Sequence, residues 1–476
     1  MTTSQGAVER KVARNISAMT LGRIGQSVMG IFATAYMVRV LGPHSFGMLS
    51  FAMAIVSYFS LISSLGIPTL ASRTLSRNLD NASEIASQMI TLLFAMGFCS
   101  FLLLLCSIPL LRLTSLQSVV LVISGLQLIL GPGAITWAFA SLQKMSTPAI
   151  VALVGTGVRV GIVFLLVHNA DDVVWATWAT VSGALVTSIG QIWFLHRMCP
   201  LRWQFSWISA RKILWTSAPM ALSLMMTKIY GNSDSVILGY MKGAVSVGYY
   251  NAAYRLIWFL TSITELYIQT VFPVSSRLYK SHRELLVPFI QHNLEIASAV
   301  AMPIVMGGWI IAPRIIHLIY GNNYIEAVEP FRILLLVWGL VVITQHYGNT
   351  LIACNGEKLF SKGVTYGAVF NVLANIVVIP RYGITGAASA TFATEILVFL
   401  YMVWAVHTKL GWYGPGWHRA VFVVVNTAIL GVFVNGLAPY VDLPILVLGS
   451  VTVYINLTLI TKVVSWNQLK LLFTRR

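Results

Sequence analysis

Residues 85–111 read IASQMITLLFAMGFCSFLLLLCSIPLL, without one charged side chain. A helix needs about 20 such residues to cross the bilayer core, because backbone polar groups in lipid must bond to each other within the helix. Other uncharged runs lie at 113–143, 173–196, 296–313, 333–356, 420–441 and 443–461. Only 9% of the chain is charged and 57% is hydrophobic, whereas soluble domains carry about 25% charged residues. The sequence therefore predicts an all-α, polytopic membrane protein.

The apolar runs and the polar breaks between them predict about fourteen transmembrane helices. They are expected at 15–38, 46–66, 85–111, 117–143, 147–168, 173–196, 213–238, 246–271, 287–313, 330–353, 361–380, 384–408, 418–438 and 443–463. The breaks are short, so no extramembrane globular domain is expected. Function must then lie within the helical bundle or at its mouths.

The distribution of lysine and arginine predicts the orientation. On this map 21 of the 31 lie on the side of the termini and six on the other side. Cytoplasmic loops of membrane proteins are enriched in Lys and Arg, so both termini are expected in the cytoplasm. The net charge of +17 is thereby explained by orientation, and no nucleic-acid partner is expected. The polar, basic residues 1–15 do not resemble a cleaved signal peptide.

An internal repeat is indicated by two similar segments. Ser45-Phe-Gly-Met-Leu-Ser-Phe-Ala52 resembles Ser246-Val-Gly-Tyr-Tyr-Asn-Ala-Ala253, which follows 201 residues later. We therefore expect a six-helix bundle at 1–200, a second at 201–410, and two extra helices with a cytoplasmic tail at 411–476. Repeats of even helix number share one orientation, so the two halves are expected to surround a central cavity.

Several short motifs together indicate a family. They are Leu41-Gly42-Pro43 followed by Phe46-Gly47, Leu65-Gly66-Ile67-Pro68, Asp234 followed by Leu238-Gly239, and Gly383-Ile-Thr-Gly386-Ala-Ala-Ser-Ala390. With them, essentially the whole chain resembles the polysaccharide-transporter (Wzx-type) flippases of the MATE-like (MOP) superfamily, which also holds multidrug exporters and the lipid II flippase.

This resemblance implies a transporter and not an enzyme, with no catalytic residues. Its expected substrate is an undecaprenyl-diphosphate-linked oligosaccharide, moved by alternating access from the cytoplasmic to the periplasmic leaflet of the bacterial inner membrane. The product would supply O-antigen, capsule or exopolysaccharide synthesis. Membrane lipids, and the polysaccharide polymerase and export machinery, are the partners that the resemblance implies.

Eight Lys, Arg, Asp and Glu residues lie inside the predicted helices and away from their ends, where a charge costs several kcal/mol unless it has a partner or a wet cavity. The cations are candidates for binding the substrate diphosphate: Arg23, Arg255, Lys228 and Arg159. The carboxylates are candidates for coupling transport to an ion gradient: Glu265, Asp234, Glu295 and Glu395. The alternative role for all eight is ion pairing that holds helices together.

No cofactor and no metal site are expected. The histidines form no metal-type cluster, and no phosphate-binding Gly-x-x-x-x-Gly-Lys-Ser/Thr loop occurs, so ATP hydrolysis by that route is not expected. The four cysteines, Cys99, Cys106, Cys199 and Cys354, lack the paired spacings of zinc sites and are expected as free thiols.

Three other functions fit a many-helix membrane protein. A multidrug exporter of the same superfamily should favour a net acidic cavity, whereas four cations and four anions lie in these helices. A lipid II flippase would share the lipid carrier and differ in the cargo. A membrane glycan polymerase usually carries a large periplasmic loop, which this chain lacks.

Overall fold

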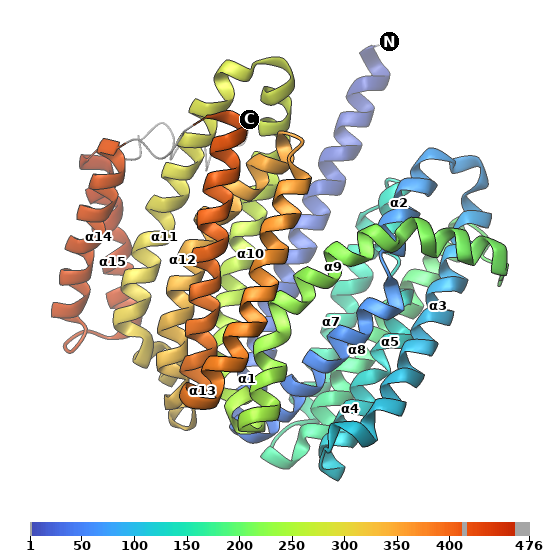
Figure 1. Cartoon of the computed structure of the whole chain (residues 1–476), viewed down its shortest axis with the longest axis horizontal. Coiled ribbons are helices and arrows are strands. Elements are labelled where there is room, and N and C mark those ends of the chain that lie inside the picture. The colour runs from blue at the N-terminus through green and yellow to red at the C-terminus, as the bar shows by residue number, and fades with distance from the viewer. Residues whose placement is uncertain (1, 412–416, 462–476) are drawn as a thin grey trace. The chain divides into compact units, whose positions relative to one another are not determined.

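The computed structural model describes residues 2–411 and 417–461, and these ranges contain helices and no β-strand (Figure 1). Ten of their helices are long and apolar enough to cross a membrane. The predicted all-α, polytopic class is confirmed. The chain forms two compact units, Met1–Gly248 and Tyr249–Arg476. The predicted domain boundaries and the central cavity stay predictions.

The first unit contains nine α-helices and several short 3-10 turns. The helices are α1 (Thr2–Ser64), α2 (Ile67–Arg77), α3 (Ala82–Ser107), α4 (Ser115–Gly125), α5 (Gln127–Leu130), α6 (Thr136–Ser141), α7 (Ser146–Leu166), α8 (Val173–Met198) and α9 (Trp207–Lys242). The start of α10 (Ala244–Ser281) also belongs to this unit. The predicted helices at 147–168, 173–196 and 213–238 correspond to α7, α8 and α9.

Two of the longest helices each contain two predicted segments. In α1 the break lies at Gly42, whose φ of 67° is accessible to glycine without strain, and Pro43 follows it. In α13 (Glu357–Leu410) the break lies at Gly383, with φ of 56°. The amide of Asn371 bonds to Thr394 Oγ1 at 3.4 Å, so the two parts of α13 pack against each other. Helices α9 and α10, which carry more polar side chains, are not among the ten apolar spans.

The segment expected as one helix at 117–143 is interrupted. It divides into α4, α5, a 3-10 turn at Gly131–Gly133 and α6. Pro132 lacks a backbone N–H, and its two glycine neighbours favour non-helical conformations. Ala134 and Ile135 then leave the helical region before α6 begins. The prediction of one continuous helix here was wrong, because Gly-Pro-Gly outweighs the apolar character of the run.

The repeated motifs meet in a reciprocal contact. Gly42 and Gly243, 201 residues apart, both have positive φ, 67° and 82°. A Cβ on Gly47 would overlap the carbonyl of Ala244, and a Cβ on Gly248 would overlap the carbonyl of Pro43. Because Ala244 and Gly248 are also the repeat equivalents of Pro43 and Gly47, the contact is close to two-fold symmetric. We call it the glycine seam.

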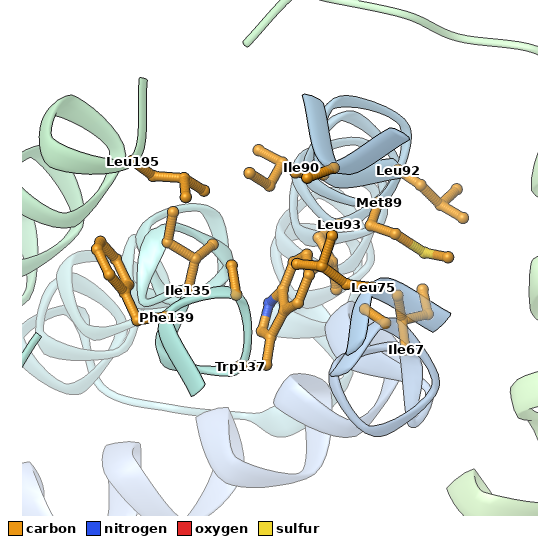
Figure 2. Packing of buried hydrophobic residues seen from close by; sticks show 14 of the residues in the cluster. Ile67, Leu75, Met89, Ile90, Leu92, Leu93, Ile135, Trp137, Phe139 and Leu195 are labelled. Carbon is orange, nitrogen blue, oxygen red and sulfur yellow. The ribbon is translucent and has the colours of Figure 1, made fainter. Parts of the chain in front are cut away.

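One end of the first unit has a core formed by short and long helices together. Buried residues of α2, α3, α6, α8 and α9 form one hydrophobic cluster. Figure 2 shows Trp137 of α6 beside Leu93 of α3 and Leu75 of α2. The helix α2 was not predicted, because its 11 residues are too few to span a membrane and its apolar residues occupy only one face.

The second unit is formed by most of α10 and by five further helices. These are α11 (Arg283–Tyr320), α12 (Val328–Ala353), α13, α14 (Trp417–Leu437) and α15 (Leu443–Ile460). Helix α14 packs on α11. At one end of α14, Arg314 of α11 donates hydrogen bonds to the carbonyls of Ala438 and Val441, at 2.6 and 2.8 Å. These carbonyls follow the helix end and lack helical partners, so Arg314 caps the hairpin.

Candidate functional site

A polar pocket of about 420 Å³ lies inside the first unit, around Arg159. Four elements line it: α1, the 3-10 turn of the interrupted segment, α7 and α8. Its wall consists of small or hydroxyl-bearing residues and one amide, namely Gln26, Ser27, Gly131, Ala134, Gly155, Thr156, Thr180, Gly183, Ala184, Thr187 and Ser188. Short side chains leave this cavity between the helices, and the hydroxyl groups that border it make its surface polar.

Close packing of α7 on α8 determines where Arg159 lies. A Cβ on Gly155 would collide with Thr187 and the Gly183 carbonyl, and a Cβ on Gly183 would lie 2.8 Å from the Gly155 carbonyl and 3.0 Å from Arg159 Cβ. The glycine pair therefore brings the helix backbones together, as small residues do in membrane bundles. The stem of Arg159 packs at this crossing.

The Arg159 guanidinium borders the pocket, and no described residue is its counter-ion. Its Nη2 atom is 3.3 Å from the position of a Cβ on Gly30 of α1. In the part of the chain that the structure describes, no ion pair or hydrogen bond to Arg159 occurs. An arginine on a membrane-spanning helix needs a partner or water. The pocket must therefore be hydrated or hold an anion.

The interrupted helix gives the pocket a backbone component. Gly131 lies in the wall, and Ser188 of α8 donates a 2.6 Å hydrogen bond to the Leu130 carbonyl. Irregular backbone at membrane depth is tolerated where it is buried in protein or lines a wet cavity. Transporters often bind ligands at such discontinuous helices. The pocket thus combines a cation, hydroxyls and a broken helix.

Two other predicted residues of the first unit, Lys228 and Asp234, lie on α9. Arg23 is in α1, and its side chain lies outside the described residues. Lys228 is exposed on α9. Asp234, on the same helix, is only 3% exposed and interacts electrostatically with Tyr58 of α1. Neither Lys228 nor Asp234 lines the pocket of Arg159.

The predicted residues of the second unit lie on three helices, α10, α11 and α13. Arg255 of α10 lies over the ring of Trp258, 5.0 Å from its centroid. Glu265, about two helix turns beyond Trp258, is exposed. Glu395 of α13 is buried and follows Thr394, which belongs to a buried polar row with Asn371 and Asn375.

Glu295 of α11 has a counter-ion, Arg419, that lies at the start of the predicted helix 418–438 and was not among the eight candidates. Arg419, near the start of α14, donates to Glu295 Oε2 at 2.5 Å. The carboxylate side chain is 7% exposed and the arginine 48% exposed. This pair joins α14 to α11 at the end opposite Arg314. The position of Arg419 directly before an apolar run marks a helix end in the sequence and does not identify its partner.

We expect Arg419→Ala to destabilise the protein more than Glu295→Gln does. Removing the arginine takes the cation at 2.5 Å away from a buried carboxylate, which keeps His292 Nδ1 at 3.8 Å. The expected cost is about 1–3 kcal/mol, less than for a fully buried pair because water screens Arg419. Melting temperatures of the full chain in detergent measure this. Glu295→Gln combined with Arg419→Gln should recover part of the loss. Equal destabilisation by the two single variants would contradict the assigned pairing.

The second unit also contains an apolar groove of about 500 Å³ between α11, α14 and α15. Its wall includes Pro303, Ile311, Val434, Leu446 and Val451, and hydroxyl groups are few. No sequence pattern located this groove, because its wall comes from helices more than a hundred residues apart. Its chemistry suits a hydrocarbon chain, which needs area and no hydrogen bonds.

Comparisons with known proteins place the chain in a family. It is 22% identical over 411 residues to an Escherichia coli protein named "Putative O-antigen transporter", covering 83% of this chain and 97% of that one. It is 24% identical over 312 residues to a probable low-salt glycan biosynthesis flippase of Haloferax volcanii, covering 62% and 64%.

Two solved structures show the same fold. The lipid II flippase MurJ in an inward closed conformation superposes with a TM-score of 0.77 at 15% identity, covering 93% of this chain and 98% of that one. An inward-facing multidrug transporter of the MATE family gives 0.63 at 16% identity, covering 81% and 95%. At these identities the likeness is one of fold alone. Residues 12–279, more than half of the chain, match the family of polysaccharide biosynthesis proteins, and the chain belongs to that family.

Proposed function

We propose that this protein is a flippase that moves an undecaprenyl-diphosphate-linked oligosaccharide from the cytoplasmic to the periplasmic leaflet of a bacterial inner membrane, by alternating access. Family membership and the names of the relatives support transport in polysaccharide synthesis. The observation that carries the substrate class is Arg159, which borders a polar pocket with no counter-ion among the described residues.

The chemistry of the proposed substrate matches two features of the pocket. A diphosphate is a compact anion, and a guanidinium binds it through paired charge-assisted hydrogen bonds. Serine and threonine hydroxyls in the same wall can donate to phosphate or sugar oxygens. Arg23, Arg255 and Lys228 remain further candidates for contacts with the diphosphate or sugars.

The driving force is proposed to be an ion gradient, with a membrane-embedded carboxylate as coupling site. Asp234 and Glu395 are the stronger candidates because both are buried. Glu265 is exposed, and Glu295 already neutralises Arg419. Cytoplasmic termini, and cooperation with a polysaccharide polymerase and export machinery, belong to the same proposal.

Deletion and complementation test this function. In a strain that lacks the gene, surface polysaccharide should disappear while lipid-linked repeat units accumulate on the cytoplasmic face, and the wild-type gene should reverse both. If the deletion strain keeps its surface glycan and becomes more sensitive to cationic drugs, the protein is a multidrug exporter and the proposal is wrong. Restoration of growth in cells depleted of their lipid II flippase would change the cargo to the peptidoglycan precursor.

A further inference from the structure

The start of α9 and the loop before it carry large apolar side chains that the protein leaves uncovered. Trp203, Trp207, Ile208 and Trp215 are 77%, 71%, 82% and 73% exposed. Three cations, Arg202, Arg211 and Lys212, are exposed among them. We call the exposed face of residues 202–215 the α9 surface.

The helix geometry sorts these residues onto two faces. At 100° per residue, Ile208, Arg211, Lys212 and Trp215 fall within one stripe. The opposite face contains Ala210, a buried member of the hydrophobic cluster formed with α2, α3, α6 and α8, and the half-buried Ile213 and Leu214, which pack against that cluster. Apolar and basic side chains thus alternate on the outward stripe. A helix surrounded by lipid tails would be apolar there, and a helix in water would be polar.

The loop before α9 is held in place by the first turns of α3. The Arg202 amide donates to Ser87 Oγ at 3.0 Å and the Gln204 amide to Thr91 Oγ1 at 3.3 Å, while Ser83 donates to the Pro200 carbonyl. The ring of Trp203 packs edge-on against Phe94, with centroids 5.8 Å apart. In Figure 1 the first turns of α9 run crosswise to α3. The α9 surface is therefore a fixed part of the unit, with few conformations to lose on binding.

We propose that the α9 surface binds the headgroup layer of the membrane and selects anionic phospholipids. Tryptophan is the side chain most typical of the boundary between headgroups and tails. An amphipathic helix with such residues on a basic face lies in the plane of the interface, and its lysines and arginines contact lipid phosphates. The surface would anchor the first unit at the interface through a phospholipid of the bulk membrane. It would hold no transport substrate.

The test is native mass spectrometry of the full-length protein in detergent, with phosphatidylglycerol or phosphatidylcholine added at equal concentrations. The wild type should retain phosphatidylglycerol in preference. The variant Arg202→Gln, Arg211→Gln, Lys212→Gln should bind phosphatidylglycerol roughly fivefold more weakly for each charge removed. A control variant, Arg112→Gln, Lys358→Gln, Arg381→Gln, loses the same charge at exposed positions elsewhere and should keep the preference.

Two outcomes would overturn the proposal. One is an equal loss of phosphatidylglycerol in the test and control variants, which would make net charge the cause. The other is displacement of the bound phosphatidylglycerol by a short-chain prenyl diphosphate at equal concentration, which would make the surface part of the transport site. If the triple variant has a lower melting temperature than the wild type, the single variant Arg211→Gln replaces it and Arg112→Gln becomes the control. Phosphatidylglycerol binding by these two variants is then interpreted in the same way.

Discussion

Replacing Arg159 with glutamine is expected to lower transport roughly 10- to 150-fold at unchanged protein level. The basis is the loss of charge-assisted hydrogen bonds to the substrate anion, worth about 1.5–3 kcal/mol. Arg159 borders the polar pocket beside the interrupted helix and has no counter-ion in the described residues. Glutamine keeps most of the stem that packs at the crossing of α7 and α8, so the fold should survive.

The measurement is the amount of surface polysaccharide and of lipid-linked repeat units in cells that carry each variant. Arg159→Lys should give an intermediate rate, because lysine keeps the charge and loses the planar fork. Arg112→Gln serves as the control, since Arg112 is an exposed cation of the same unit outside the pocket. Normal transport by Arg159→Gln would exclude the pocket as the diphosphate site.

Stability separates this prediction from a structural role of Arg159. An arginine that ties helices together would lower the melting temperature when it is replaced. An uncompensated cation in a membrane-spanning helix costs free energy, so Arg159→Gln is expected to leave the melting temperature unchanged or raise it. The combination of lost transport and unreduced stability is the signature of a residue whose partner is the substrate.

The apolar runs predicted most of the helical map because chain length and hydrophobicity decide membrane insertion. Over the residues that the structure describes, each of the fourteen predicted segments falls mainly on helical residues, and the one at 117–143 is interrupted. Hydropathy misses such an interruption, because Gly and Pro lower the mean hydropathy of a long run only slightly. It also misses α2, whose apolar residues Ile67, Leu70, Ala71 and Leu75 face protein instead of lipid.

The sequence identified Arg159 as a candidate residue, but it did not predict the pocket that surrounds it. That Arg159 sits inside a helix marked it as a candidate, since ionisable residues are rare there. Its pocket depends on the close approach of Gly155 in α7 and Gly183 in α8. The sequence of one helix alone does not show which residue of another helix it will contact. The partner of Glu295 was missed for a different reason. Arg419 lies at a helix end, where sequence cannot tell a lipid-facing cation from one that turns back towards the bundle.

Replacing Gly47 with alanine is expected to destabilise the protein by about 1–3 kcal/mol, the usual cost of overfilling a packed contact. A methyl group there would overlap the backbone carbonyl of Ala244. Backbone cannot move aside by changing a rotamer, so α1 and the start of α10 would have to separate. Gly248→Ala should cost a similar amount, because its methyl meets the Pro43 carbonyl in the mirrored position.

Both substitutions affect the same contact, so the stability losses that they cause are expected to be non-additive. The double variant Gly47→Ala, Gly248→Ala should lose less stability than the two single losses together, because the first methyl already opens the glycine seam for the second. Gly231→Ala is the matched control. No atom lies within 4 Å of its Cβ position, and alanine in a helix is favoured over glycine by about 0.5–1 kcal/mol. Melting temperatures of the four variants in detergent measure these stability changes. Full additivity, or a loss in Gly231→Ala equal to that in Gly47→Ala, would mean that the repeats do not meet through these glycines.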